Sequence, residues 1–99
     1  MEFLVEFEVD VPADTPDKEV ERRQRAESAA AAKLAEDGHL VRLWRLPTGG
    51  DGATAIGLYR ADTEAKLDGL LGALPLADWL HITVTPLEGH ANDPGSAPR

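Results

Sequence analysis

Glu27 is the residue whose type and spacing best suit proton-transfer chemistry. It shares a predicted helical face with three apolar residues at spacings of seven, four and three: Val20, Ala31 and Leu34. This stripe predicts that Glu27 points toward a sheet, where loss of solvent raises the pKa of a carboxylate. A general acid or base that works near neutral pH needs such a shift. The alternative is a slightly rotated helix, in which Glu27 lies at the rim of the stripe and pairs with Arg23.

Glu6 is the second carboxylate that could move a proton. It lies in a segment of alternating character, with one side formed by Phe3, Val5, Phe7 and Val9 and the other by Leu4, Glu6 and Glu8. This period of two predicts a half-buried strand. Glu6 then faces either solvent or a cavity at a subunit junction. Glu8 beside it favours the solvated alternative.

Two arginines flank a tryptophan and could bind an anionic ligand. Because strand residues alternate, Arg42 and Trp44 are predicted on one face, and Arg45 joins Leu43 on the other. A guanidinium binds a carboxylate through two hydrogen bonds, and an indole forms a flat apolar wall for a small planar molecule. We therefore expect one arginine, with Arg45 favoured, to point into a pocket. Surface pairing with the excess of acids is the alternative.

The three histidines could each transfer a proton near neutral pH. Their spacing matches no metal motif, so we expect no metal site. His39 begins a predicted strand and His90 lies near the C-terminus, where solvated side chains are usual. His81, inside a predicted strand, is the better candidate for a place in the site.

The elements that must position these residues are signalled by caps and periodicity. A helix is predicted from a cap at Thr15 to about Asp37, ended by Gly38 in a left-handed conformation. Strands are predicted at 39–46 and 54–60, joined by a hairpin loop at 48–52. A second helix, capped at Asp62 or Thr63 and ended by Pro75, carries one stripe of leucines: Leu67, Leu70, Leu71 and Leu74. After a turn at 77–78, the last strand follows at 80–87.

This order, βαββαβ, predicts an α+β fold of the ferredoxin-like type. Right-handed crossovers give a four-stranded antiparallel sheet with both helices on one face. We expect a single domain at 1–88 and an extended or flexible C-terminal arm at 89–99. Because apolar residues occur on both sides of several strands, the face without helices is expected to meet another subunit, so that the protein forms a homo-oligomer.

Composition excludes several classes of partner. The 99 residues carry 10 Lys and Arg against 18 Asp and Glu, a net charge of -8 that repels nucleic acid. The sequence contains no run long and apolar enough for a membrane span. It has no cysteine and no basic, apolar start typical of a signal peptide, so we expect a cytoplasmic protein.

Several short motifs, in order along nearly the whole chain, resemble those of the muconolactone delta-isomerase family. They are Val5-Glu6, Glu27, Leu43-Trp44-Arg45, Leu74-Pro75-Leu76, Val84-Thr85-Pro86-Leu87 and His90. The resemblance implies a ferredoxin-like subunit, of the dimeric α+β barrel type, in a large homo-oligomer that is typically a decamer. It also implies an enzyme of the β-ketoadipate pathway for aromatic catabolism that needs no metal or organic cofactor.

The implied reaction moves a double bond in a small acidic lactone by proton transfer. Glu27 or Glu6 would shuttle the proton, and Arg45 would hold the substrate carboxylate or the dienolate oxygen. Trp44 would shape the cavity, with Arg42 and His81 as further substrate-binding candidates. The alternatives are a divergent member of the family that acts as a cyclase or cofactor-free monooxygenase in secondary metabolism, and a noncatalytic protein that binds small molecules.

Overall fold

The computed structural model describes residues 1–47 and 54–95, in which the predicted βαββαβ order is found. The elements are β1 (Glu2–Val9), α1 (Asp17–Glu36), β2 (Leu40–Arg45), β3 (Thr54–Arg60), α2 (Glu64–Gly72) and β4 (Leu80–Leu87). The hairpin loop predicted at 48–52 lies outside the described residues.

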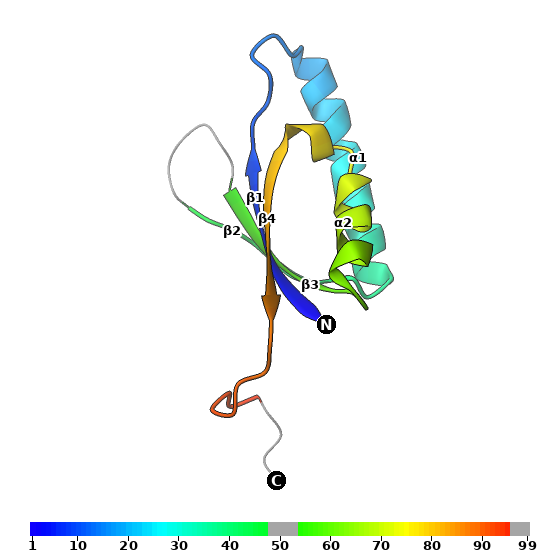
Figure 1. Cartoon of the computed structure of the whole chain (residues 1–99). Coiled ribbons are helices and arrows are strands. Elements are labelled where there is room, and N and C mark those ends of the chain that lie inside the picture. The colour runs from blue at the N-terminus through cyan, green and yellow to red at the C-terminus, as the bar shows by residue number, and fades with distance from the viewer. Residues whose placement is uncertain (48–53, 96–99) are drawn as a thin grey trace.

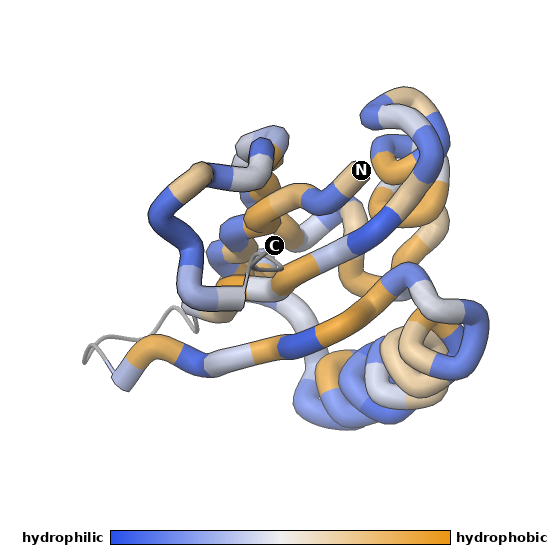
Figure 2. The backbone as a smooth tube through the Cα atoms, turned by 90° about the horizontal axis from the view of Figure 1, so that it is seen from below, coloured by the Kyte–Doolittle hydropathy of each residue, from blue (hydrophilic) through white to orange (hydrophobic). Residues whose placement is uncertain are grey.

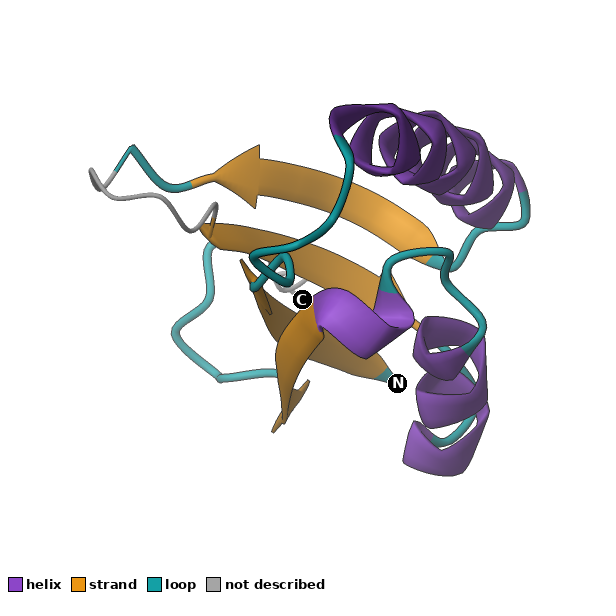
Figure 3. Ribbon diagram, turned by 90° about the horizontal axis from the view of Figure 1, so that it is seen from above, coloured by secondary structure: helices purple, strands orange, loops and turns teal. Residues whose placement is uncertain are grey.

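The strands form one antiparallel sheet in the order β2-β3-β1-β4. Both helices cover the same face of this sheet, as Figures 1 and 3 show. The prediction of a ferredoxin-like α+β fold is therefore confirmed. The C-terminal arm, described as far as residue 95, is exposed and leads away from the body (Figure 1).

The core lies between the helices and the sheet. Phe3, Val5 and Phe7 of β1 point into it, as the alternation of that strand predicts, and the leucines of the α2 stripe meet them from the other side. Phe3, Val5 and Leu67 are completely buried. Figure 2 shows hydrophobic residues along the strands, whereas the outer part of α1 is hydrophilic. The helix thus contributes one narrow apolar stripe.

The end of α1 was correctly predicted and its beginning was not. Gly38 adopts a φ of 84°, and its N–H donates to the carbonyl of Ala35 while the N–H of His39 donates to that of Leu34. These two bonds form a Schellman motif. The predicted cap by Thr15 is wrong, because Pro16 itself takes the N-cap position and no side chain caps the helix. Thr15 lies one residue too early to reach the first free N–H groups.

The second helix and the turn after it also differ in detail from the prediction. Of the two caps considered, Thr63 is the one used, and its hydroxyl accepts from the N–H of Lys66 at 3.1 Å. The helix ends at Gly72, before Pro75, although Leu74 remains buried beyond it. The turn predicted at 77–78 is one turn of 3-10 helix, Ala77–Trp79. Because of this turn, the chain from residue 74 to residue 80 lies over the edge of the core.

The face of the sheet without helices, here called the open face, carries both apolar and charged side chains. Leu4, Ile56 and Leu58 are half-buried on it, and Trp44 is 45% exposed. The register places these residues on one side because Leu4 pairs with Leu58 and Trp44 pairs with Ile56. None of the helices among the described residues is long and apolar enough to span a membrane.

Candidate functional site

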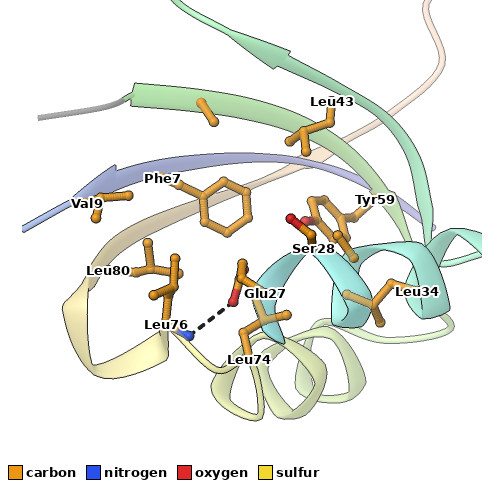
Figure 4. Close-up of a pocket in the computed structure, with 12 residues that line it drawn as sticks. Phe7, Val9, Glu27, Ser28, Leu34, Leu43, Tyr59, Leu74, Leu76 and Leu80 are labelled. Carbon is orange, nitrogen blue, oxygen red and sulfur yellow. Dashed lines mark hydrogen bonds between the residues drawn. The ribbon is translucent and has the colours of Figure 1, made fainter. Parts of the chain in front are cut away.

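A pocket of about 230 Å³ lies between α1, the helix-covered face of the sheet and the segment 74–80. Figure 4 shows its lining, which is mostly aliphatic and aromatic. The residues that line it are Phe7, Val9, Glu27, Ser28, Ala31, Leu34, Leu43, Ala55, Tyr59, Leu74, Leu76 and Leu80. A pocket of this size and character suits one small, largely apolar molecule.

Glu27 points into this pocket, as its helical stripe predicts. Its side chain is half-buried, and its Oε1 accepts a hydrogen bond from the backbone N–H of Leu76 at 3.0 Å. Burial raises the pKa of Glu27 above its ordinary value of 4.5, and the bond from Leu76 partly opposes this rise. The carboxylate is thereby both oriented and made more basic, which are the two properties that a general base requires.

Arg23 does not pair with Glu27, so the rotated-helix alternative is wrong. Its guanidinium instead contacts Glu19 at 3.1 Å, Asp78 at 2.7 Å and the carbonyl of Pro75 at 3.3 Å. It also lies over the ring of Trp79, 4.4 Å from the ring centre. Arg23 therefore fastens α1 to the segment 75–79, which includes the Leu76 N–H that holds Glu27.

Tyr59 of β3 and Ser28 of α1 supply the hydroxyl groups of the pocket. Tyr59 is 4% exposed, and its ring centre lies 5.9 Å from that of Phe7. Burial raises the pKa of Tyr59 to about 12, with a further contribution from the charge of Glu27. The sequence analysis missed Tyr59. The alternation along 54–60 was the available signal, because it places Tyr59 on the face of Ala55 and Gly57.

Arg45 lies on the pocket side of the sheet, at its rim. It pairs with Ala55 and follows Leu43 by two residues, and both of these neighbours line the pocket. Arg45 itself is exposed and is absent from the lining. The expectation that Arg45 and Leu43 share a face is confirmed. Its role as an anchor for the substrate carboxylate stays a prediction.

The other candidate residues lie on the open face, and the single chain does not bring them together with Glu27. Glu6 is exposed between Ile56 and Thr83. The guanidinium of Arg42 lies 5.3 Å from the ring centre of Trp44, and the Nε2 of His81 lies 3.6 Å from a carboxylate oxygen of Asp10. Within this chain, Trp44 therefore does not form a wall of the pocket that contains Glu27.

The arrangement suits proton transfer on a small molecule. A half-buried carboxylate of raised pKa meets a pocket that otherwise offers two hydroxyl groups and apolar walls. Among residues 1–47 and 54–95, no group of three or more His, Cys, Asp or Glu is placed to hold a metal ion.

Comparisons with known proteins agree along almost the whole chain. The family model of muconolactone delta-isomerase matches residues 1–93. The chain is 32% identical over 90 residues to muconolactone delta-isomerase 1 of Acinetobacter lwoffii, a match that covers 91% of each protein. It is 31% identical over 90 residues to muconolactone delta-isomerase of Cupriavidus pinatubonensis, covering 91% of this chain and 95% of that protein. A crystal structure of muconolactone isomerase has the same fold, with a TM-score of 0.83 at 24% identity and full coverage of both chains.

Proposed function

Because this chain belongs to the muconolactone delta-isomerase family, we propose that it isomerises muconolactone, or a closely related acidic lactone, with Glu27 as the group that moves the proton. The observation that carries this proposal is the half-buried carboxylate of Glu27, held by Leu76 inside an apolar pocket. The reaction belongs to aromatic catabolism. The chain contains no cysteine, which fits the reducing cytoplasm where we propose that it acts.

The proposed reaction has two proton transfers. The Glu27 carboxylate removes a proton from the saturated carbon next to the C=C that is conjugated with the lactone carbonyl, and the electrons of that C–H bond form a new C=C bond while the old one shifts toward the carbonyl carbon. The carbonyl becomes the C–O⁻ of a dienolate. The protonated Glu27 then returns the proton to another carbon of the conjugated system, the carbonyl re-forms, and the double bond has moved. One carboxylate serves both steps, because the proton that it accepts in the first step is the proton that it donates in the second, after which it is again ionised.

The pocket supports this chemistry in two ways. Its apolar walls exclude water from the reacting atoms, which strengthens electrostatic interactions there. We further propose that Arg45, at the rim, pairs with the carboxylate of the substrate and thereby directs the lactone ring toward Glu27. The exposed position of Arg45 lets its guanidinium remain hydrated until substrate arrives.

The alternative functions are not favoured. The identity to named isomerases extends over nine-tenths of the chain, which favours an isomerase over a cyclase or monooxygenase that shares only the fold. A noncatalytic binding protein would be favoured if Glu27 and Arg45 were both exposed and unconnected, and Arg45 is exposed. Glu27 is instead half-buried and hydrogen-bonded.

The decisive test is turnover in deuterated water. Purified protein mixed with muconolactone is followed by NMR, which reports both the isomerised lactone and deuterium incorporated at carbon. We expect isomerisation, with deuterium uptake wherever Glu27 exchanges its proton with solvent before returning it. A folded protein that leaves muconolactone unchanged would overturn the proposed substrate.

The pH dependence of kcat/KM should carry an acid limb set by Glu27. The base must be ionised to accept a proton, so kcat/KM falls as the pH drops through the pKa of Glu27 in the free enzyme. Burial raises that pKa above 4.5, and the limb should therefore lie above the range of an exposed glutamate. Initial rates from about pH 4 to pH 9 measure it. A limb at or below the ordinary value would contradict the role of Glu27.

We also propose that the protein is a homo-oligomer assembled through the open face. Beside its charged residues, this face carries the half-buried Leu4, Ile56 and Leu58 and a 45% exposed Trp44, which is apolar surface of the kind that a second subunit covers. Glu6, Arg42 and His81 would then lie in or beside the contact, and their predicted roles near the substrate depend on the second subunit.

Sedimentation velocity should give a mass several times 10.6 kDa, and the family resemblance favours a decamer. Trp44→Glu should lower this mass, whereas a monomeric parent protein would contradict the proposal.

A further inference from the structure

We propose, on the basis of the isomerase function above, that Tyr59 is a second catalytic residue, whose phenol hydroxyl donates a hydrogen bond to the dienolate oxygen. Glu27 moves the proton, but a carboxylate cannot stabilise the negative charge that appears on the substrate. A donor directed at that oxygen is needed.

The phenol of Tyr59 is a hydrogen-bond donor in the lining of the pocket. The residue is only 4% exposed, yet its side chain lines the cavity that Glu27 enters. Within residues 1–47 and 54–95, no protein group forms a hydrogen bond with its hydroxyl. Among the described residues, no fully buried side-chain oxygen or nitrogen lacks a hydrogen-bond partner, so the unpartnered hydroxyl of Tyr59 is itself open to the pocket and available to a ligand. Figure 4 shows Glu27, Ser28 and Tyr59 directed into the same space.

The position of the Tyr59 ring depends on two neighbours. Phe7 packs against it with ring planes inclined by 57°. Gly57 lies on the same face two residues earlier, and a Cβ atom there would come within 2.5 Å of the Cε1 of Tyr59. Only a residue without a side chain lets the ring occupy this place. The local sequence Gly57-Leu58-Tyr59 thus sets the orientation of the phenol.

The charge changes during the reaction match a neutral donor at this position. Before proton transfer the negative charge is on Glu27, and afterwards it is on the substrate oxygen. A pKa of about 12 keeps Tyr59 protonated throughout, so it acts as a donor and does not compete with Glu27 as a base. Its O–H bond stays intact in both steps. The other residues that line the pocket, apart from Ser28 and Glu27, are apolar.

The first test is the kinetics of Tyr59→Phe, which removes only the hydroxyl and keeps the ring packed on Phe7. Loss of one donor to a developing oxyanion typically lowers kcat by about 10²-fold or more. We expect a loss of this size with KM changed by less than about threefold, because the dienolate exists only after substrate has bound. Isomerisation and deuterium uptake should slow together, since both pass through the dienolate. An unchanged kcat would overturn the proposal, as would the same loss in Ser28→Ala without one in Tyr59→Phe.

The second test does not depend on turnover of muconolactone. The anion of tetronic acid is a stable enolate of a five-membered lactone, and Glu27→Gln imitates the protonated base that faces the dienolate. Calorimetric titration of Glu27→Gln and of the double variant Glu27→Gln, Tyr59→Phe compares the same anion with and without the phenol. We expect at least about tenfold weaker binding by the double variant, because hydrogen bonds to charged groups are strong.

The two tests separate failure of this proposal from failure of the proposed function. If muconolactone is not turned over but tetronate binding depends on Tyr59, the proposed substrate is rejected and Tyr59 is retained as a hydrogen-bond donor. Isomerase activity that requires Glu27, together with unchanged kcat and equal tetronate affinities, would retain the isomerase and reject Tyr59. Failure of both proteins to bind tetronate would also overturn the role of the pocket as an enolate site.

Discussion

The change Glu27→Gln is expected to lower kcat by about 10² to 10⁴-fold, the range in which general acid–base groups contribute. The amide cannot accept the proton, but its oxygen can still accept the hydrogen bond from the N–H of Leu76, so the side chain should remain in place. Rates measured by NMR or ultraviolet absorbance, together with circular dichroism and sedimentation, test this. Glu21→Gln is a matched control, because Glu21 is an exposed glutamate of the same helix. A Glu27→Gln variant with the full rate would remove Glu27 as the base.

The same substitution has a second readout in stability. A glutamate whose pKa is raised in the folded state binds its proton more tightly there than in the unfolded chain. The contribution of Glu27 to the free energy of unfolding is therefore fully present below its pKa in the unfolded chain. It is lost as the pH rises through its pKa in the folded protein. Glutamine does not titrate. The melting temperature of Glu27→Gln relative to the parent should consequently increase with pH above about 4.5 and then level off. A difference that is constant with pH would contradict the raised pKa.

The change Leu67→Ala should produce the largest loss of stability, about 2 to 5 kcal/mol. Leu67 is 0% exposed and lies where α2 packs on the sheet, so its removal leaves a cavity that the surrounding side chains cannot fill. Since a small domain has only about 5 to 15 kcal/mol in total, much of the protein would be unfolded at mild denaturant concentration. Urea titration at fixed protein concentration measures the effect. Leu70→Ala, in the same helix but half-buried, should lose clearly less, and equal losses would contradict this description of the core.

Much of the fold was predictable because each local signal has one physical cause. The alternation from Phe3 to Val9 specifies a strand with one buried side, and Gly38 can adopt the positive φ that ends α1. The helical spacing around Glu27 predicted a carboxylate that faces the sheet. These features depend on periods of 2 and 3.6 residues and on single-residue conformations, all of which are properties of a short stretch of sequence.

The partners within the site were not predictable in the same way. Glu27 meets the N–H of Leu76, 49 residues away, and this contact depends on where α2 ends and on the 3-10 turn at Ala77–Trp79. The alternation in β2 correctly separated Arg45 from Trp44, but it could not show which of the two faces the helices cover. Tyr59 was missed because a strand pattern assigns a side chain to one face of the sheet without indicating how deeply it is buried. Its place also depends on the missing side chain of Gly57.

The group that orients Glu27 is part of the main chain, and this has a consequence for how the enzyme can evolve. Every amino acid except proline supplies the same N–H at position 76, while the side chain there forms part of the pocket wall. Mutations at this position can therefore alter the shape of the cavity, and with it the choice of lactone, while the base keeps its hydrogen bond. Substrate preference and proton transfer are thus open to separate selection at a single residue.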